Sequence, residues 1–516
     1  MSSSSDTARP SPPEPEPWAS LYAALSEGDP DKVRALIEEG ADIHYTRPHG
    51  YDAFLDAVHG RDVSRDGRLL ELLALLVEHR VDPSGVSTYG ESALNVLSGL
   101  GRFDGVRLLL DTGAERSLLG WTPLMEAVAL GSIADVQAAL VQGADLEARD
   151  YWSRTPWLIA LLTGDIARAS LLRDRGADPD ARGHCGSPPL FYAIRGHHPE
   201  MLRWLLQHQA DLHATDELGA TPLMEAVEGD DLACVEILLD AGASVRASTG
   251  GTALTQAGSR EMILRLLDAG ADPASLSYEG QRTVLGLPEI DDEALAALSR
   301  RDARQALAPA FGRANPERMN VPFREAMIRC GATAYAARLR FEEALGSIDK
   351  PVWCARRFGQ SLTLLPDGRA IQIGGEHEDH YDPDFCIYND VFVHGPDGSV
   401  TIYGYPSSVF PPTDFHTATL LGGCIYVIGC LGYPEQRQPG TTPVFRLDLN
   451  TLRIDRIDTR GEAPGWIYGH RAVAISPHEI RVEGGEVLVR RAGGKSWGPS
   501  SGAFVLDVER RLWRRA

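Results

Sequence analysis

Cysteine is scarce in this sequence of 516 residues, and no cysteines are spaced as cross-linking or metal binding would require. The seven cysteines are odd in number and widely separated, with no CxxC pair among them. This spacing argues against a disulfide framework and against a structural zinc site. It favours a reducing compartment for Cys185, Cys234, Cys330, Cys354, Cys386, Cys424 and Cys430.

Long hydrophobic runs are also missing. A membrane-spanning helix requires about 18 uncharged apolar residues, and the most apolar segment, residues 69–77, is already interrupted by Glu71. Residues 1–17 have neither the basic start nor the apolar stretch of a secretory signal. Their Ser, Pro and Glu content predicts a disordered N-terminus. We therefore expect a cytoplasmic protein without a membrane partner.

Positive charge is in deficit. The 50 Lys and Arg residues face 72 Asp and Glu residues, which gives a formal net charge of −22. A field of this sign repels phosphate backbones, so we expect no nucleic-acid partner. The apolar fraction of 43% and the charged fraction of 24% are ordinary for folded proteins. The length exceeds what one hydrophobic core accommodates, which predicts more than one domain.

What the first half does contain is an internal repeat. The heptapeptide TPLMEAV occupies Thr122–Val128 and recurs at Thr221–Val227, a shift of 99 residues, or three times 33. A second marker, Gly-Ala-Asp or a close variant, keeps the 33-residue spacing over four units that start at Gly143, Gly176, Gln209 and Gly242. Two independent markers with one period indicate a solenoid of stacked units.

Each marker has a structural reason. A threonine hydroxyl caps a helix, a proline suits the first helical position, and a glycine ends a helix in the left-handed conformation. Each unit is therefore expected to be a pair of short antiparallel helices. The pattern resembles the ankyrin repeat over residues 18–280, with about eight units, four of them regular. Arg80 and Gln209 replace the terminating glycine, where we expect a strained backbone or a different helix end.

Residues 281–350 lose the repeat but keep apolar residues at helical spacing, most clearly over 323–345. A solenoid needs an atypical end unit to cover its last apolar face. We expect this segment to be a helical cap or linker that packs towards the following domain.

Residues 351–516 alternate apolar and polar residues between glycine-containing turns, which predicts strands. Three segments align with one another, and each is followed by a further strand pair. The segments are 357–376, 414–430 and 469–486, and the pairs are 390–394 with 399–403, 443–449 with 452–457, and 503–508 with 512–513. Four short strands in a unit of about 50 residues are typical of a propeller blade. The diglycines Gly374-Gly375 and Gly484-Gly485 and the late Trp513 resemble those of the kelch repeat.

Three such units are fewer than the roughly four to eight blades of closed propellers. The set is either open with covered edges, completed by a divergent blade, or completed by a second chain. The predicted fold class is therefore multidomain α + β, with an ankyrin-repeat α-solenoid followed by a kelch-like β-propeller domain, closed or incomplete.

The densest group of ionisable residues lies in one loop of the second half and contains His377, His380, Asp382 and Asp384. Such residues could bind a divalent metal or divide acid and base roles. The favoured interpretation is a solvated or structural loop, since polar residues collect in loops, and a ligand-contacting surface is the next. Because no second ligand cluster and no nucleophile or phosphate-binding motif accompanies them, we expect no metal site, no cofactor and no catalytic residue.

Two histidines, His416 and His470, occupy matching positions in two of the kelch-like units, where Gln360 stands in the other. Matching positions in a repeat predict a packing role or a repeated hydrogen bond.

The resemblance to ankyrin repeats implies that partners bind at the turn tips and the exposed side of each first helix. Aromatic and arginine side chains there suit interface anchors, although Trp121 or Trp152 could instead pack on a neighbouring tip. The expected binding residues are Leu118, Trp121, Tyr151, Trp152, Arg154, His184, Arg195, Glu217 and Glu228.

These features predict a non-catalytic adaptor whose partner is a protein or peptide, with the kelch-like domain as a second interaction module. The alternative is a carbohydrate- or small-molecule-acting enzyme, metal-dependent or not, on the kelch-like domain. The two differ in whether the ionisable residues of the β-rich half converge on a pocket.

Overall fold

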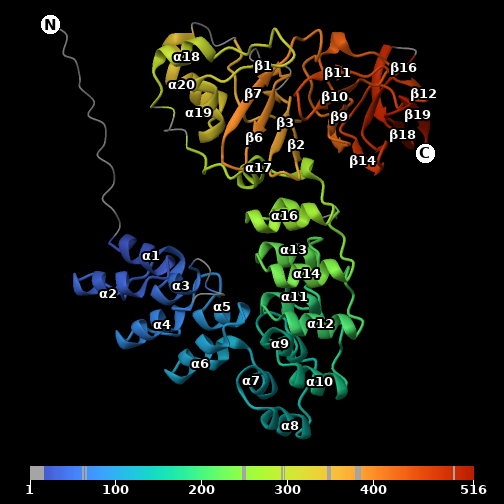
Figure 1. Cartoon of the computed structure of the whole chain (residues 1–516). Helices are drawn as coiled ribbons and strands as arrows, with labels where there is room; N and C mark the ends of the chain where they lie inside the picture. Colours follow the sequence, from blue (N-terminus) through green and yellow to red (C-terminus); the bar gives the residue numbers. More distant parts are fainter. Residues whose placement is uncertain are drawn as a thin grey trace, which may run out of the picture. The chain divides into compact units, whose positions relative to one another are not determined.

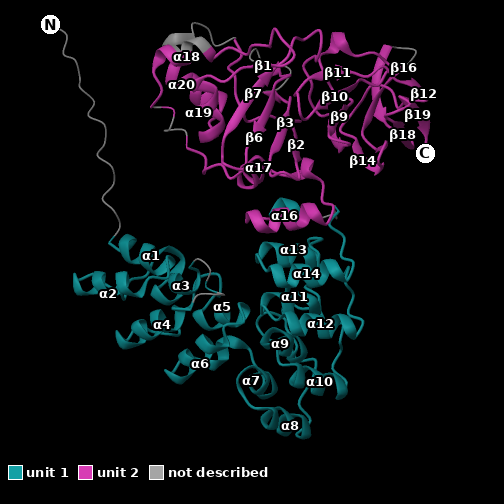
Figure 2. Ribbon diagram, in the orientation of Figure 1, with its two compact units in different colours: residues 1–256 teal, residues 257–516 magenta. Residues whose placement is uncertain are grey.

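The computed structural model describes residues 17–60, 63, 67–246, 251–291, 295, 297–345, 350–377, 385–491 and 494–516. The segment predicted to be disordered, 1–17, lies outside this range except for its last residue. The chain divides into two compact units, residues 1–256 and 257–516 (Figure 2). The boundary falls within the 18–280 segment that the repeat spacing assigns to one array.

The first unit consists of consecutive helix pairs (Figure 1). Its helices are α1 (Ala19–Ser26), α2 (Pro30–Glu38), α3 (Ala53–Val58), α4 (Leu69–Glu78), α5 (Ala93–Gly99), α6 (Phe103–Asp111), α7 (Pro123–Leu130), α8 (Ile133–Val141), α9 (Pro156–Thr163), α10 (Ile166–Asp174), α11 (Pro189–Arg195), α12 (Pro199–Gln207), α13 (Pro222–Glu228), α14 (Leu232–Asp240) and α15 (Ala253–Gln256).

The repeat markers adopt the predicted conformations. The Thr122, Thr155 and Thr221 hydroxyls each accept a hydrogen bond from a backbone N–H in the first turn of α7, α9 and α13, at 3.3, 3.4 and 3.3 Å. These caps satisfy donors that a helix start otherwise leaves unpaired. Arg80 and Gln209 have φ of 59° and 66°, so both helices end in the left-handed conformation that glycine adopts elsewhere in the repeat.

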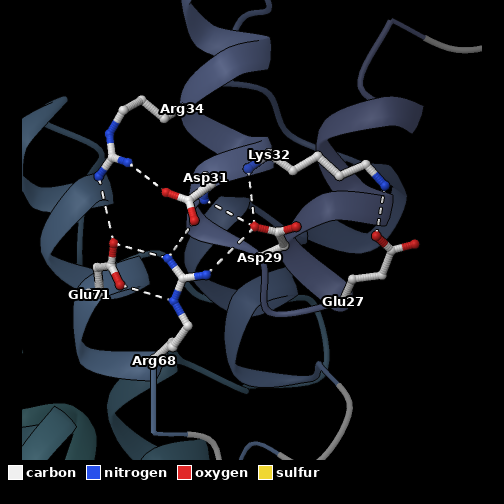
Figure 3. A network of polar contacts seen from close by, with 7 residues as sticks. All are labelled: Glu27, Asp29, Asp31, Lys32, Arg34, Arg68 and Glu71. Atoms are coloured by element: carbon white, nitrogen blue, oxygen red, sulfur yellow. Dashed lines mark hydrogen bonds and ion pairs between the residues drawn. The ribbon is translucent and has the colours of Figure 1, made fainter.

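An exposed ion-pair network joins α2 and α4. Arg68, at the N-terminal end of α4, lies 2.8 Å from Asp31 and 3.1 Å from Glu71, while Arg34 lies 3.1 Å from Asp31 (Figure 3). Exposed pairs of this kind contribute about 0–1 kcal/mol each. The network therefore adds little to the free energy of unfolding.

The stack of first helices bends between α5 and α7. Helices α1, α3 and α5 pack in sequence, and so do α7, α9, α11 and α13. Helix α5 packs against the short helix η2 (Arg116–Leu119), which precedes α7. The first unit therefore has two arms, α1–α6 and α9–α14, with α7 and α8 at the turn (Figure 1).

The second unit combines helices with antiparallel sheets. Its helices are α16 (Arg260–Asp268), α17 (Tyr278–Leu285), α18 (Arg300–Ala306), α19 (Pro322–Cys330) and α20 (Ala334–Leu345), and the short helix η4 (Pro273–Ser275) precedes α17. Helices α19 and α20 lie within the segment 323–345 that the apolar spacing predicts to be helical, apart from Pro322 at the start of α19.

Three principal sheets correspond to the three units expected from the sequence. Their strand orders are β1-β7-β6-β3-β2, β11-β10-β9-β8 and β12-β19-β18-β15-β14, and they are called sheets 1, 2 and 3. The bounds are β1 (Glu317–Arg318), β2 (Ser361–Leu364), β3 (Ala370–Ile373), β6 (Val391–His394), β7 (Val400–Gly404), β8 (Thr417–Leu421), β9 (Cys424–Ile428), β10 (Val444–Asp448), β11 (Ile454–Arg456), β12 (Arg460–Gly461), β14 (Arg471–Ser476), β15 (Glu479–Glu483), β18 (Ala503–Asp507) and β19 (Leu512–Arg515).

Two smaller sheets accompany them. One has the order β13-β16-β17, with β13 (Ile467–Tyr468), β16 (Glu486–Arg491) and β17 (Gly494–Pro499). The other pairs β4 (Glu376–His377) with β5 (Cys386–Ile387). Within the described part of the chain, the sheets form no closed barrel or ring.

Apolar clusters join successive layers of the second unit. Phe323 and Met327 of α19 pack with Phe392 and Ile402, on one face of sheet 1. Ile371 and Ile373 on the other face pack with residues of sheet 2, and sheet 2 packs in turn on sheet 3. The order of layers is therefore helices, sheet 1, sheet 2 and sheet 3.

A buried ion pair fixes the chain where it enters sheet 1. The Arg357 side chain is fully buried and forms an ion pair with Asp390, beside the start of β6. Its guanidinium lies 3.6 Å from the Tyr388 ring centroid, and the Trp353 Nε1–H donates to Asp390 at 3.1 Å. Because a buried charge must be paired, neither partner can be lost without a large cost.

Candidate functional site

A cavity of about 1060 Å³ in the first unit is a groove between its two arms. Residues of and next to α3 and α5 line one side, and residues of and next to α11 and α13 line the other. The bend is what places these helices opposite one another (Figure 1). We call this cavity the groove.

The turn before α9 holds the bend in place. The Trp152 Nε1–H donates to the Asn95 carbonyl at 2.6 Å, and Arg154 donates to the Ser98 carbonyl at 2.6 Å. Asn95 and Ser98 lie on α5, two repeats earlier in the chain. A Cβ on Gly99 would lie 3.0 Å from the Trp152 indole, closer than most such contacts, so the indole would have to shift slightly to accommodate any larger residue there.

Arg154 belongs to the interior. It is only 1% exposed, and its guanidinium lies 2.6 Å from the Asp150 carboxylate, which is itself buried. The expectation that Arg154 is an exposed contact residue therefore does not match its burial. Trp152 is half-buried and packs within the chain, which corresponds to the alternative weighed for it, whereas Tyr151 is 42% exposed.

Five of the nine expected binding residues line the groove, namely Trp152, Arg154, His184, Arg195 and Glu228. The other four do not. Leu118 and Trp121 are half-buried against the apolar core of the N-terminal arm, whereas Tyr151 and Glu217 are exposed outside the groove.

The sequence reasoning missed the residues of the N-terminal arm that complete the groove. His59 and Glu91 line it from the repeats of α3 and α5. Regular repeats predict a continuous stack, in which these residues would be far from α13. The one signal for a bend was the pair Trp152 and Arg154, which are large side chains at a turn position.

Of the charged side chains on the groove walls, Arg195 and Glu91 are hydrogen-bonded within the chain, whereas Glu228 is exposed. Arg195 forms two hydrogen bonds with Glu225, at 2.5 and 3.2 Å. Burial lowers the pKa of Arg195, but the pairing with Glu225 and nearby negative charge offset this effect, so that the pKa is raised. Glu91 accepts a hydrogen bond from the Tyr51 hydroxyl at 2.7 Å, and this bond raises the pKa of Tyr51 to about 12. Glu228 is exposed at the end of α13.

A second cavity, of about 720 Å³, lies in the second unit. One edge strand of each principal sheet, namely β2, β8 and β14, lines it together with residues 270–281. His416 and His470 are at equivalent places in this lining. His416 is hydrogen-bonded to the Ser361 hydroxyl at 2.8 Å and His470 to the Thr417 hydroxyl at 3.0 Å. The predicted repeated hydrogen bond is present, and it links each sheet to the preceding one.

Burial keeps both imidazoles neutral. It lowers the pKa of His416 to about 3 and that of His470 to about 4. Each neutral imidazole uses one ring nitrogen for a hydrogen bond to the neighbouring sheet, which indicates a structural role. The Nδ1 atom of each ring has no hydrogen-bond partner among the described residues, so no carboxylate completes either hydroxyl–imidazole pair.

The loop with the densest ionisable residues is only partly described. His380, Asp382 and Asp384 lie outside the described residues, while His377 is buried in β4 opposite Cys386. Among the described residues, no group of three or more His, Cys, Asp or Glu side chains is placed to hold a metal ion. Nor does any described helix have the length and apolar character needed to cross a membrane.

Comparison with known proteins supports the repeat assignment. The family model of ankyrin repeats (3 copies) matches residues 124–216, 157–249 and 190–276. No curated protein matches the chain. Ankyrin repeats suggest protein–protein interaction, and the first helices α7, α9, α11 and α13 begin at Pro123, Pro156, Pro189 and Pro222, 33 residues apart. The chain therefore carries ankyrin repeats between residues 124 and 276, followed by a β-rich C-terminal region of several antiparallel sheets.

Proposed function

We propose that the chain is a non-catalytic cytoplasmic adaptor that holds a segment of a partner protein in the groove of its first unit. The observation that carries this proposal is the groove itself, a preformed concave surface between two arms fixed by Trp152 and Arg154. A surface that is already ordered reduces the entropy lost on binding.

The β-rich unit is proposed to be a kelch-like second interaction module of open form. Each of its three principal sheets contains the four strands expected of such a unit, helices cover sheet 1, and the outer face of sheet 3 carries the ion pairs Arg481–Glu483 and Arg514–Glu479 at 2.9 and 3.0 Å. A charged outer face suits solvent better than a further sheet. The neutral, hydrogen-bonded histidines of its cavity favour this role over an enzyme.

A display library of random peptides, selected on the full-length chain, tests the groove. A benzophenone amino acid in place of His184, which is exposed in the groove, is expected to cross-link the selected peptides. The same group in place of Glu236, exposed on the outer helix α14, is the matched control and should not. Equal cross-linking at the two positions, or none at His184, would contradict the proposal.

A further inference from the structure

The groove also carries information about the chemistry of its partner. Its lining contains the carboxylates of Glu91, Glu225, Glu228 and Asp230 but only two guanidinium groups. From this imbalance we infer that the groove recognises an arginine or lysine side chain of the partner. The inference rests on the proposed function and specifies the partner for it.

Both guanidinium groups of the lining are committed within the chain. Arg154 is buried against Asp150, and Arg195 is held by Glu225 through two hydrogen bonds. Neither guanidinium is available to an acidic partner, because binding one would leave the buried Asp150 or the half-buried Glu225 unpaired. The positive charge of each guanidinium in the groove is therefore neutralised by a carboxylate of the same chain.

The remaining carboxylates lie on opposite walls. Glu91 belongs to the N-terminal arm, where the Tyr51 hydroxyl donates to it and the His59 Nε2 lies 3.7 Å away. Glu228, which is exposed, ends α13 on the other arm. A cation between the arms would face negative charge on two sides. The net charge of −22 adds a long-range attraction for a basic segment.

Apolar side chains between the carboxylates suit the stem of such a residue. Val58 of α3, Val96 of α5 and Leu100, which follows α5, line the groove, and so does the half-buried Trp152. Arg and Lys bury their methylene stems against apolar surface and keep the charge near polar groups. An aromatic ring also attracts a cation placed over its face. A purely acidic or purely apolar segment would satisfy only part of this surface.

The experiment uses peptides selected on the full-length chain from a random display library, and compares their Lys and Arg content with that of the unselected library. Fluorescence anisotropy then measures the affinity of one selected peptide for the chain and for two variants. Glu228→Lys reverses a charge in the groove. Glu236→Lys makes the same change on the outer helix α14, so both variants have equal net charge.

Enrichment of Lys and Arg, with affinity reduced about tenfold by Glu228→Lys and unchanged by Glu236→Lys, is the expected result. Replacing the basic residues of the peptide by glutamine should weaken binding to the same degree. Peptides that cross-link at His184 but show no such enrichment and no sensitivity to Glu228→Lys would overturn this inference alone. Failure of any peptide to cross-link at His184 would overturn the proposed function and this inference with it.

Discussion

The bend of the first unit should depend on the buried Arg154. In Arg154→Met the hydrogen bonds to α5 are lost, and the Asp150 carboxylate stays buried without its cation. Removing one partner of a buried ion pair costs about 3–5 kcal/mol. Since about 1.4 kcal/mol is a factor of ten, local opening of α5 should become more frequent by a factor of 100 or more.

Hydrogen–deuterium exchange of the full-length chain measures this opening. Faster exchange is expected in α5 and α9, which Arg154 joins, and unchanged exchange in β9 of the second unit. The control is Arg203→Met, because Arg203 on α12 forms an exposed ion pair with Glu200 at 2.6 Å, which contributes about 1 kcal/mol or less.

The double variant Asp150→Asn with Arg154→Met removes the unpaired charge, so it should recover part of the lost protection. Unchanged exchange of α5 in Arg154→Met, or a change no larger than in Arg203→Met, would refute the reasoning that this side chain holds the two arms together.

Three further results are expected. The free energy of unfolding of the second unit should fall between about pH 6.5 and pH 5, by about 2 kcal/mol each for His416 and His470, because these imidazoles bind protons in the unfolded chain but stay neutral in the folded one. The urea midpoint should depend less on pH when both histidines are replaced by glutamine. An unchanged pH dependence of that midpoint would contradict their burial as neutral groups. Asp390→Ala should cost about 3–5 kcal/mol by leaving Arg357 unpaired, seen as faster hydrogen exchange in β6, and normal protection there would count against it. Thr221→Ala should destabilise α13 by about 1 kcal/mol through loss of its cap, and identical exchange in that helix would argue that the cap is dispensable.

Local structure followed closely from the sequence. The pair predicted at 390–394 and 399–403 is β6 and β7, and the markers of the first half start and end helices as their chemistry requires. The matching histidines form the predicted repeated bond. These predictions held because caps, turns and alternation act over a few neighbouring residues.

The binding residues were harder to predict. A turn position suggests exposure, and Arg154 occupies one, yet it is buried because the turn reaches α5. Burial depends on what another part of the chain places there, and spacing along the sequence does not contain that information.

The sequence by itself determined that paired helices at a 33-residue period are followed by strand pairs at a spacing of about 55 residues, since both patterns are local and repeated. Only the tertiary structure decided that the stack bends and that Glu91 and Glu228 line one groove. The physical reason is that a few long-range contacts, from Trp152 and Arg154 to α5, outweigh the continuous stacking that identical neighbouring units would otherwise favour.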